Sequence, residues 1–120
     1  MSTLHATTKL NIVAVTACVT GVAHTYMAAE RLEKLAKEYS FNVKIETQGV
    51  LGIKGKLTSA DVEKADVVII ASDININEPD RFTHCRLINV KISALLLHPE
   101  TVISSIKKIA RFPRNTVIDM

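Results

Sequence analysis

Apolar residues occur along the chain in short runs separated by polar stretches. Residues 10–16 and 66–72 are mostly apolar and β-branched, so each run is predicted to be a strand buried on both faces. Residues 41–47 alternate apolar and charged side chains, which is typical of a strand exposed on one face, at or near a sheet edge. Residues 86–90 are predicted to form a short fourth strand.

Helical spacing of apolar residues predicts an amphipathic helix over residues 24–39. A capping-box pattern at residues 58–61 predicts a short second helix that ends near Ala65. Pro99 fits the first position of a last helix, and Pro113 stops that helix. Residues 48–57 hold three of the four glycines and are predicted to be a loop.

The predicted order of elements is β-α-β-α-β-β-α, with two strand–helix–strand crossovers. Such crossovers favour an open, mainly parallel sheet with helices on both faces. We therefore expect an α/β fold, Rossmann-like or phosphatase-like, with four strands in the order 2-1-3-4. We also expect residues 1–120 to form a single domain, with a core at about residues 10–110 and short polar tails at both ends.

The composition is that of an ordinary globular domain. The chain has 120 residues, of which 48% are hydrophobic and 22% charged, with 4 Gly and 3 Pro. These values exclude disordered, collagen-like and linker-rich chains, and 2 Cys exclude a disulfide-dense scaffold. Residues 1–9 lack the apolar segment of a signal peptide, and no apolar run is long enough to cross a bilayer. We therefore expect a cytoplasmic domain.

A net charge of +3 raises the question of nucleic-acid binding. The basic cluster near the C-terminus consists of Lys107, Lys108, Arg111 and Arg114. These residues fit the solvated face and last turn of a helix, where cations complement the helix dipole. Aromatic residues make up 4% of the chain and Trp is absent, so there is no stacking platform for bases. We expect no nucleic-acid partner.

The segment between the first strand and the first helix carries the candidate chemistry. Cys18 stands where the strand ends, and open α/β sheets bind their ligands beyond that end. The following turn and helix start supply backbone N–H groups that suit a phosphate or a thiolate. A helix N-terminus stabilises an anion by about 0.3–1 kcal/mol. The candidate phosphate-binding residues are Val19, Thr20, Gly21, Val22, Ala23, His24 and Thr25.

Simpler interpretations of these residues stay open. Cys18 could be a small buried hydrophobic residue at a strand end. His24 could orient a phosphate, bond a loop carbonyl or merely begin the helix. Cys85 has no glycine loop after it and is predicted to be structural. The other histidines have no partner at metal-ligand spacing, so no metal and no cofactor is predicted; they are His5, His84 and His98.

Several motifs resemble a known family. Residues 18–30, with the sequence CVTGVAHTYMAAE, are similar to the active-site loop of the fructose/mannitol-type enzyme IIB of the bacterial phosphotransferase system. Residues 46–49, with the sequence ETQG, match a second motif of that family, and further matches include Asp73 and residues 81–82. The resemblance covers about residues 10–109. Val19 stands where family members usually have proline.

The resemblance implies a phosphotransferase that works as a small, stand-alone IIB component. It implies that Cys18 accepts a phosphoryl group from a phosphohistidine of enzyme IIA. The group would then pass to a fructose-like sugar held by the membrane-embedded enzyme IIC, with which the chain would associate. It also implies a four-stranded parallel sheet flanked by helices.

Other functions remain as alternatives. A degenerate, regulatory IIB-like protein could dock the same partners without carrying phosphate. A low-molecular-weight phosphatase has a similar cysteine loop but needs an arginine six residues after the cysteine to clamp phosphate, and this chain has His24 there. A thiol redox protein is disfavoured because the chain has no C-x-x-C motif, and a nucleotide-binding module because it has neither glycine-rich phosphate motif.

Overall fold

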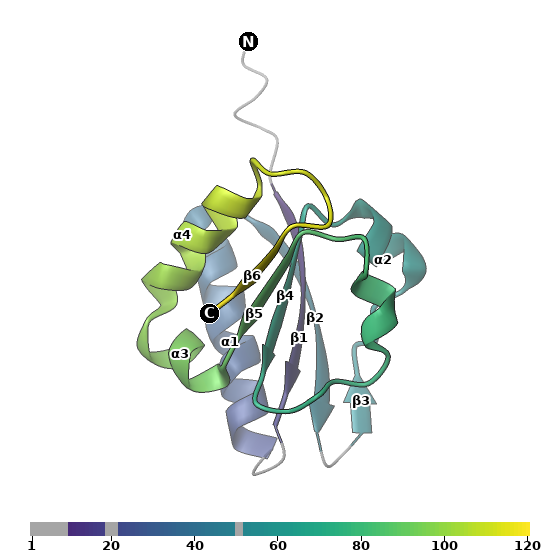
Figure 1. Ribbon diagram of the computed structural model, residues 1–120. Helices are drawn as coiled ribbons and strands as arrows, with labels where there is room; N and C mark the ends of the chain where they lie inside the picture. The colour runs from purple at the N-terminus through teal and green to yellow at the C-terminus, as the bar shows by residue number, and fades with distance from the viewer. Residues whose placement is uncertain (1–9, 19–21, 50–51) are drawn as a thin grey trace.

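The computed structural model describes residues 10–18, 22–49 and 52–120. Its centre is a mixed sheet of six strands in the order β3-β2-β1-β4-β5-β6 (Figure 1). The strands are β1 (Asn11–Ala17), β2 (Asn42–Gly49), β3 (Gly52–Lys54), β4 (Val67–Ser72), β5 (Leu87–Val90) and β6 (Val117–Asp119). The helices are α1 (Val22–Tyr39), α2 (Ser59–Lys64), α3 (Ile92–Leu97) and α4 (Pro99–Ile109), with a short 3-10 helix η2 (Pro79–Phe82).

The prediction of four strands is wrong, because a short strand is added at each edge of the sheet. The strands β2, β1, β4 and β5 are neighbours in the predicted relative order, but β3 and β6 extend the full order beyond 2-1-3-4. β3 pairs antiparallel with the end of β2, and β6 pairs parallel with β5. Both added strands have three mostly exposed residues. Backbone pairing holds them in place, and such pairing leaves no apolar pattern in the sequence.

Two segments therefore differ from their predictions. The predicted loop over residues 48–57 contains the end of β2 and all of β3. The predicted polar C-terminal tail beyond residue 110 contains β6. A third difference is α3, whose sequence ISALLL is too short and too uniformly apolar to show helical periodicity.

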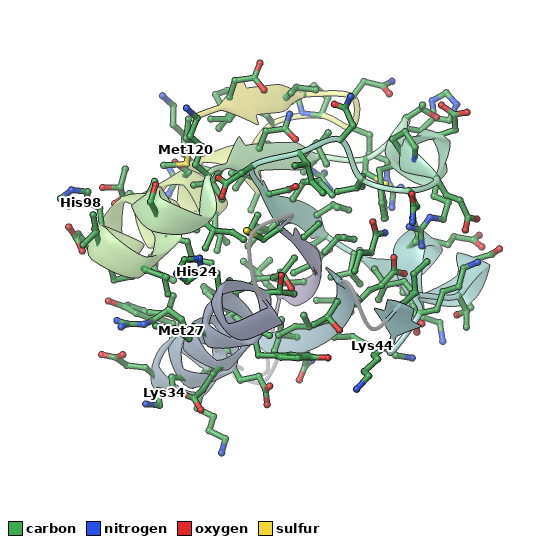
Figure 2. All side chains as sticks on the ribbon, turned by 90° about the horizontal axis from the view of Figure 1, so that it is seen from below. His24, Met27, Lys34, Lys44, His98 and Met120 are labelled. Atoms are coloured by element: carbon green, nitrogen blue, oxygen red, sulfur yellow. The ribbon has the colours of Figure 1, made fainter. Side chains whose placement is uncertain are left out.

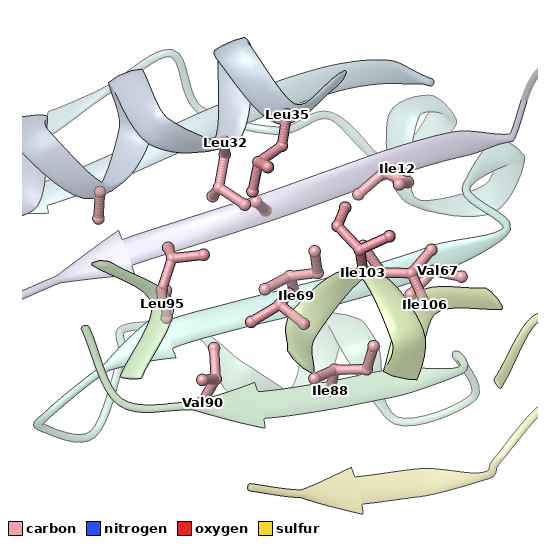
Figure 3. Close-up of a cluster of buried hydrophobic side chains, with 14 of the residues drawn as sticks. Ile12, Leu32, Leu35, Val67, Ile69, Ile88, Val90, Leu95, Ile103 and Ile106 are labelled. Atoms are coloured by element: carbon pink, nitrogen blue, oxygen red, sulfur yellow. The ribbon is translucent and has the colours of Figure 1, made fainter. Parts of the chain in front are cut away.

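The central strands are buried on both faces, as predicted. Along β1, Ile12 and Ala14 pack into one hydrophobic cluster, whereas Val13 and Val15 pack into the other. The first cluster joins the sheet to α1, α3 and α4, and Figure 3 shows its side chains between these helices and the strands. The second cluster joins the opposite face to α2 and η2. Because side chains alternate along a strand, each buried strand contributes to both clusters.

Local signals placed the helix ends well. The predicted capping box is present at the start of α2, where the Asp61 N–H donates to Thr58 Oγ1 and the Thr58 N–H donates to Asp61 Oδ2. Pro99 begins α4, and Lys107 and Lys108 lie in its last turn. Within the described residues, no helix has the length and apolarity needed to cross a membrane.

The parallel strands bring their C-terminal ends to one edge of the sheet, at the bottom of Figure 1. In the register of the sheet, Ala17 at the end of β1 is paired with Gln48 on β2 and with Ser72 on β4. Cys18, the loop after β4 and the β2–β3 hairpin therefore meet at this edge. The fold places the candidate site here.

Gly55, directly after β3, is predicted to be the most sensitive glycine of the hairpin segment. Its φ is +65°, and a Cβ at this position would lie 2.8 Å from the Ile45 carbonyl oxygen. The left-handed conformation alone costs a side chain about 1–2 kcal/mol. We therefore expect Gly55→Ala to lower the free energy of unfolding by about 2 kcal/mol or more, measured by urea denaturation.

Gly49→Ala is the matched control. Gly49 has no positive φ, and a Cβ there meets nothing within 4 Å. This variant should be neutral, or more stable by up to about 1 kcal/mol through lower entropy of the unfolded chain. Equal losses of stability in the two variants would contradict the assigned role of Gly55.

Candidate active site

Cys18 lies directly after β1 and is almost completely buried, with 5% of its surface exposed. Its Sγ donates a hydrogen bond to Asp73 Oδ2 across 4.0 Å. Asp73 follows β4, the strand beside β1, and is itself exposed to solvent. The thiol is therefore packed into the core on one side and faces an acidic group at the sheet edge on the other.

The structure covers part of the predicted phosphate-binding loop. Val19, Thr20 and Gly21 lie outside the described residues. Val22 and Ala23 form the start of α1, which has no acidic residue in its first turn. The backbone N–H groups of a first helical turn have no partner within the helix and favour anions. Because the first turn of α1 has no acidic side chain, no negative charge of the helix itself opposes the binding of an anion to these N–H groups.

The two remaining candidates, His24 and Thr25, differ in exposure. His24 is exposed, whereas only 1% of Thr25 is exposed. Figure 2 views the molecule from the edge that holds Cys18 and labels His24 and Met27 on the first turns of α1. His24 is thus available to a ligand or partner at this edge. Thr25 is held against the core beneath it.

Three threonine hydroxyls are buried, one on β1, one on β2 and one in the first turn of α1. Thr16, Thr25 and Thr47 each bury Oγ1 completely, and none of these atoms has a hydrogen-bond partner within the described part of the chain. Thr16 and Thr47 are register partners on β1 and β2. A buried polar atom that lacks a partner costs about 1–3 kcal/mol. Such atoms are expected where a ligand supplies the missing partner.

A buried ion pair lies at the same edge. Glu46 on β2 has no exposed surface, and both of its oxygens accept from the Arg81 guanidinium at 2.8 and 3.0 Å. Gln48 Nε2 and the Leu57 N–H donate to the same carboxylate at 2.7 and 2.9 Å. Arg81 also donates to the Asn77 carbonyl. The carboxylate therefore joins β2 to the segment before α2 and to the loop before β5.

These contacts decide the protonation of Glu46. Burial by itself raises the pKa of this carboxyl, but the hydrogen bonds from Arg81, Gln48 and Leu57, together with the Arg81 charge, outweigh burial. The pKa of Glu46 is therefore lowered from its ordinary value, and the pKa of Arg81 is raised by the same pair. Both groups are charged at neutral pH.

Cys85 has different surroundings, as the sequence predicted. It is buried in the cluster on the opposite face, and burial raises the pKa of its thiol. A cavity of about 660 Å³ opens beside it, lined by residues around α2 and η2, and Cys18 is not among them. No described cluster of three or more His, Cys, Asp or Glu side chains is arranged to hold a metal ion.

Sequence reasoning missed two contacts of this edge. Asp73 and residues 46–49 and 81–82 appeared only as matches to a family pattern, without any pairing between them. The pairs Cys18–Asp73 and Glu46–Arg81 are separated by 55 and 35 residues along the chain. Two signals were present in the sequence: Asp73 directly follows a mostly apolar strand, and Arg81 lies in a segment rich in Asn, Pro and Asp. Neither signal indicates which residue the side chain contacts.

Comparison with known proteins gives a consistent picture. The family model described as "PTS system, Lactose/Cellobiose specific IIB subunit" matches residues 13–105. The PTS system fructose-like EIIB component 3 of Escherichia coli (strain K12) is 49% identical over 105 residues, which cover 88% of this chain and 93% of that protein. The fructose-specific EIIABC component of Bacillus subtilis (strain 168) is 44% identical over 95 residues, which cover 79% of this chain and 15% of that longer protein.

Solved structures agree. A crystal structure of a predicted fructose-specific IIB from Escherichia coli superposes with a TM-score of 0.87 at 47% identity, covering 91% of this chain and 96% of that one. A domain of the fructose-specific IIABC component from Borrelia burgdorferi superposes with a TM-score of 0.78 at 40% identity, covering 83% of this chain and 96% of that domain. The structural similarity therefore extends over more than four-fifths of the chain.

Breaking the buried Glu46–Arg81 ion pair is predicted to lower the free energy of unfolding far more than breaking an exposed ion pair. In Arg81→Met the Glu46 carboxylate stays buried with two neutral donors, which should lower the free energy of unfolding at pH 7 by about 3–5 kcal/mol. Lys56→Met breaks the exposed Lys56–Glu78 pair, whose side chains are about half exposed, and should cost about 1 kcal/mol or less.

The pH dependence of the loss separates charge from packing. In the wild type the lowered pKa of Glu46 adds stability above the unfolded value of about 4.3, and this stability is lost as pH falls through the folded value. In Arg81→Met burial dominates, so lowering the pH protonates Glu46 and the difference from wild type shrinks. Urea unfolding at pH 7 and pH 5 measures this. An equal loss at both pH values would contradict the electrostatic role.

Proposed function

The chain belongs to the IIB family of the bacterial sugar phosphotransferase system, and we propose that Cys18 is the residue that carries its phosphoryl group. IIB components are phosphotransferases, and the relatives described above make this chain a phosphoryl carrier for fructose-like sugars. The proposal concerns the finer steps: which atom is loaded, what stabilises it, and from which partners the group comes and goes.

The position of Cys18 carries the proposal. The residue lies between the end of a central strand and the start of the 18-residue helix α1. An anion on Sγ would face the positive end of the α1 dipole. This is the arrangement expected for a cysteine that is alternately a nucleophile and a phosphate ester.

Loading exchanges one phosphorus bond for another. The Cys18 sulfur attacks a phosphohistidine of enzyme IIA; the S–P bond forms, the N–P bond breaks, and the thiol proton goes to the departing imidazole. In the second step the S–P bond breaks, a sugar oxygen bonds to phosphorus, and the hydroxyl proton returns to the sulfur. The chain ends each cycle unchanged, so it acts as a carrier and needs no cofactor.

The phosphoryl oxygens need hydrogen-bond donors while the sulfur holds them. We assign this role to the backbone N–H groups of residues 19–23, to Thr20 and to the buried Thr25 hydroxyl, with exposed His24 at the rim. Thr25 Oγ1 supports the assignment because it is fully buried and has no partner among the described residues. A phosphoryl oxygen would supply that partner and would gain a charge-assisted hydrogen bond.

Exposed apolar side chains near the same edge suit the docking of partner proteins. They are Tyr26 and Met27 on the first turns of α1, Ile53 on β3, Ile74 after β4 and Leu97 at the end of α3. Exposed apolar side chains of this kind can contact a partner protein. We propose that this edge receives enzyme IIA and then the membrane-embedded enzyme IIC in turn.

The names of the relatives support the proposed partners and sugar class. In the EIIABC proteins of Bacillus subtilis and Mycoplasma pneumoniae, a region similar to this chain occupies 15% of a protein whose name joins A, B and C components. Both of these proteins are named as fructose-specific, and the small relatives are named as fructose-like. We infer that this chain serves a fructose-like sugar, although its family model is described as lactose/cellobiose-specific.

A hydrolytic, phosphatase-like function receives no support from the site. His24 occupies the position where that chemistry needs an arginine. Arg81, in the 3-10 helix η2, donates to both carboxylate oxygens of Glu46. A carrier has to pass its phosphoryl group onward, and a weaker grip on phosphate suits that task.

Substituting Cys18 is predicted to abolish phosphoryl acceptance. After incubation with phosphoenolpyruvate, the general phosphotransferase proteins and an enzyme IIA, mass spectrometry should detect one phosphoryl group on the wild type and none on Cys18→Ser. The control Cys85→Ser should load normally because that thiol lies in the cluster on the opposite face. Normal labelling of Cys18→Ser would refute the proposal, and a wild type that stays unlabelled would favour a docking role without phosphate.

Thr25→Val is predicted to separate function from stability. Removing a buried hydroxyl that lacks a partner should leave the free energy of unfolding unchanged or raise it by up to about 1 kcal/mol. Loss of a charge-assisted donor should slow phosphoryl transfer by about tenfold or more in single-turnover measurements. Thr16→Val also removes a buried hydroxyl, so it should change the free energy of unfolding as Thr25→Val does. Its rate of phosphoryl transfer should change less. Equal rates for wild type and Thr25→Val would remove Thr25 from the site.

A further inference from the structure

The loop after β4 brings a carboxylate to the thiol of the proposed phosphoryl carrier. Asp73 Oδ2 lies 4.0 Å from Cys18 Sγ, and the thiol is the donor. The two residues stand one position beyond a register pair, because Ala17 on β1 is paired with Ser72 on β4. The contact therefore follows from the pairing of two central strands.

The loop that holds Asp73 is fixed at both ends. On one side Ser72 Oγ accepts from the Ile74 N–H at 3.0 Å and donates to the Ile74 carbonyl at 2.6 Å. On the other side the Asn77 N–H donates to Gln48 Oε1 at 2.8 Å, and its carbonyl accepts from Arg81. These bonds tie the segment to β4, to β2 and to the buried Glu46–Arg81 pair. Asp73 is thereby held next to the sulfur.

The carboxylate of Asp73 affects the free energies of the thiol, thiolate and phosphorylated states of Cys18 differently. The neutral thiol can donate a hydrogen bond to it, so this state is stabilised. A thiolate has no proton to donate and brings a second negative charge within about 4 Å, which at the dielectric constant of water disfavours it about fivefold. A phosphoryl group adds up to about two negative charges and so meets a larger repulsion.

We propose that Asp73 sets the transfer potential of the phosphorylated site: it favours the unloaded thiol over phosphocysteine and so promotes passage of the phosphoryl group to the next acceptor. The inference rests on the proposed function of Cys18. No bond to Asp73 is made or broken; its carboxylate repels the loaded state and accepts a hydrogen bond from the thiol that unloading restores.

The first test needs no partner protein. Asp73→Asn removes the charge with little change of shape, and Asp80→Asn removes one exposed charge from η2 in the same segment. Iodoacetamide alkylation near pH 7, followed by peptide mapping, measures the alkylation rate of Cys18, with the rate of Cys85 as the internal reference. We expect Cys18 to react about fivefold faster in Asp73→Asn and at the wild-type rate in Asp80→Asn. An unchanged or slower rate in Asp73→Asn overturns the proposal.

The second test measures the loaded state. Wild type, Asp73→Asn and Asp80→Asn are each equilibrated with limiting phosphorylated enzyme IIA, and phosphocysteine is quantified by mass spectrometry. We expect Asp73→Asn to shift the equilibrium toward phosphocysteine by about tenfold or more. Identical equilibria for wild type and Asp73→Asn overturn the proposal. A wild type that never loads refutes the proposed function instead, and the alkylation test still decides whether Asp73 opposes an anion at Sγ.

Discussion

The buried carboxylate of Glu46 is the constraint on which the functional edge depends. A charge without solvent exposure is tolerated only when donors surround it, and here Arg81, Gln48 and the Leu57 N–H supply them. Those donors come from β2, from the segment before α2 and from the 3-10 helix η2. Satisfying one carboxylate therefore fixes the positions of three parts of the chain relative to the sheet.

The same network reaches the candidate site through the loop after β4. Arg81 and Gln48 both bind Asn77, and this holds the far end of the segment that begins with Asp73. An effect of Arg81 on transfer would therefore act by positioning, because both terminal nitrogens of its guanidinium donate to Glu46. The hydrogen bonds of Asn77 thus link the buried ion pair to the loop that begins with Asp73.

Local signals predicted much of this fold, and long-range pairing decided the rest. The β-branched run of β1, the amphipathic α1 and the capping box at Thr58 each follow from neighbouring residues, and the structure confirms them. β3 and β6 exist because a partner strand lies beside them, so three exposed residues gave no pattern to detect. The position of Cys18 directly after a predicted strand was enough to identify it as a candidate residue. Its contact with Asp73 could not be predicted in the same way, because it depends on the register of β1 against β4.

The start of α1 and the carboxylate of Asp73 have opposite effects on an anion at Sγ, which suits the proposed role of Cys18 as a carrier. The start of α1, without acidic residues in its first turn, favours an anion on the sulfur. Asp73 disfavours the same anion. On the inference above, the start of α1 favours the loaded state and Asp73 favours the unloaded state. Each effect is of the order of 1 kcal/mol, so in the proposed carrier the helix start and Asp73 act on an anion at Sγ with opposite sign and similar size.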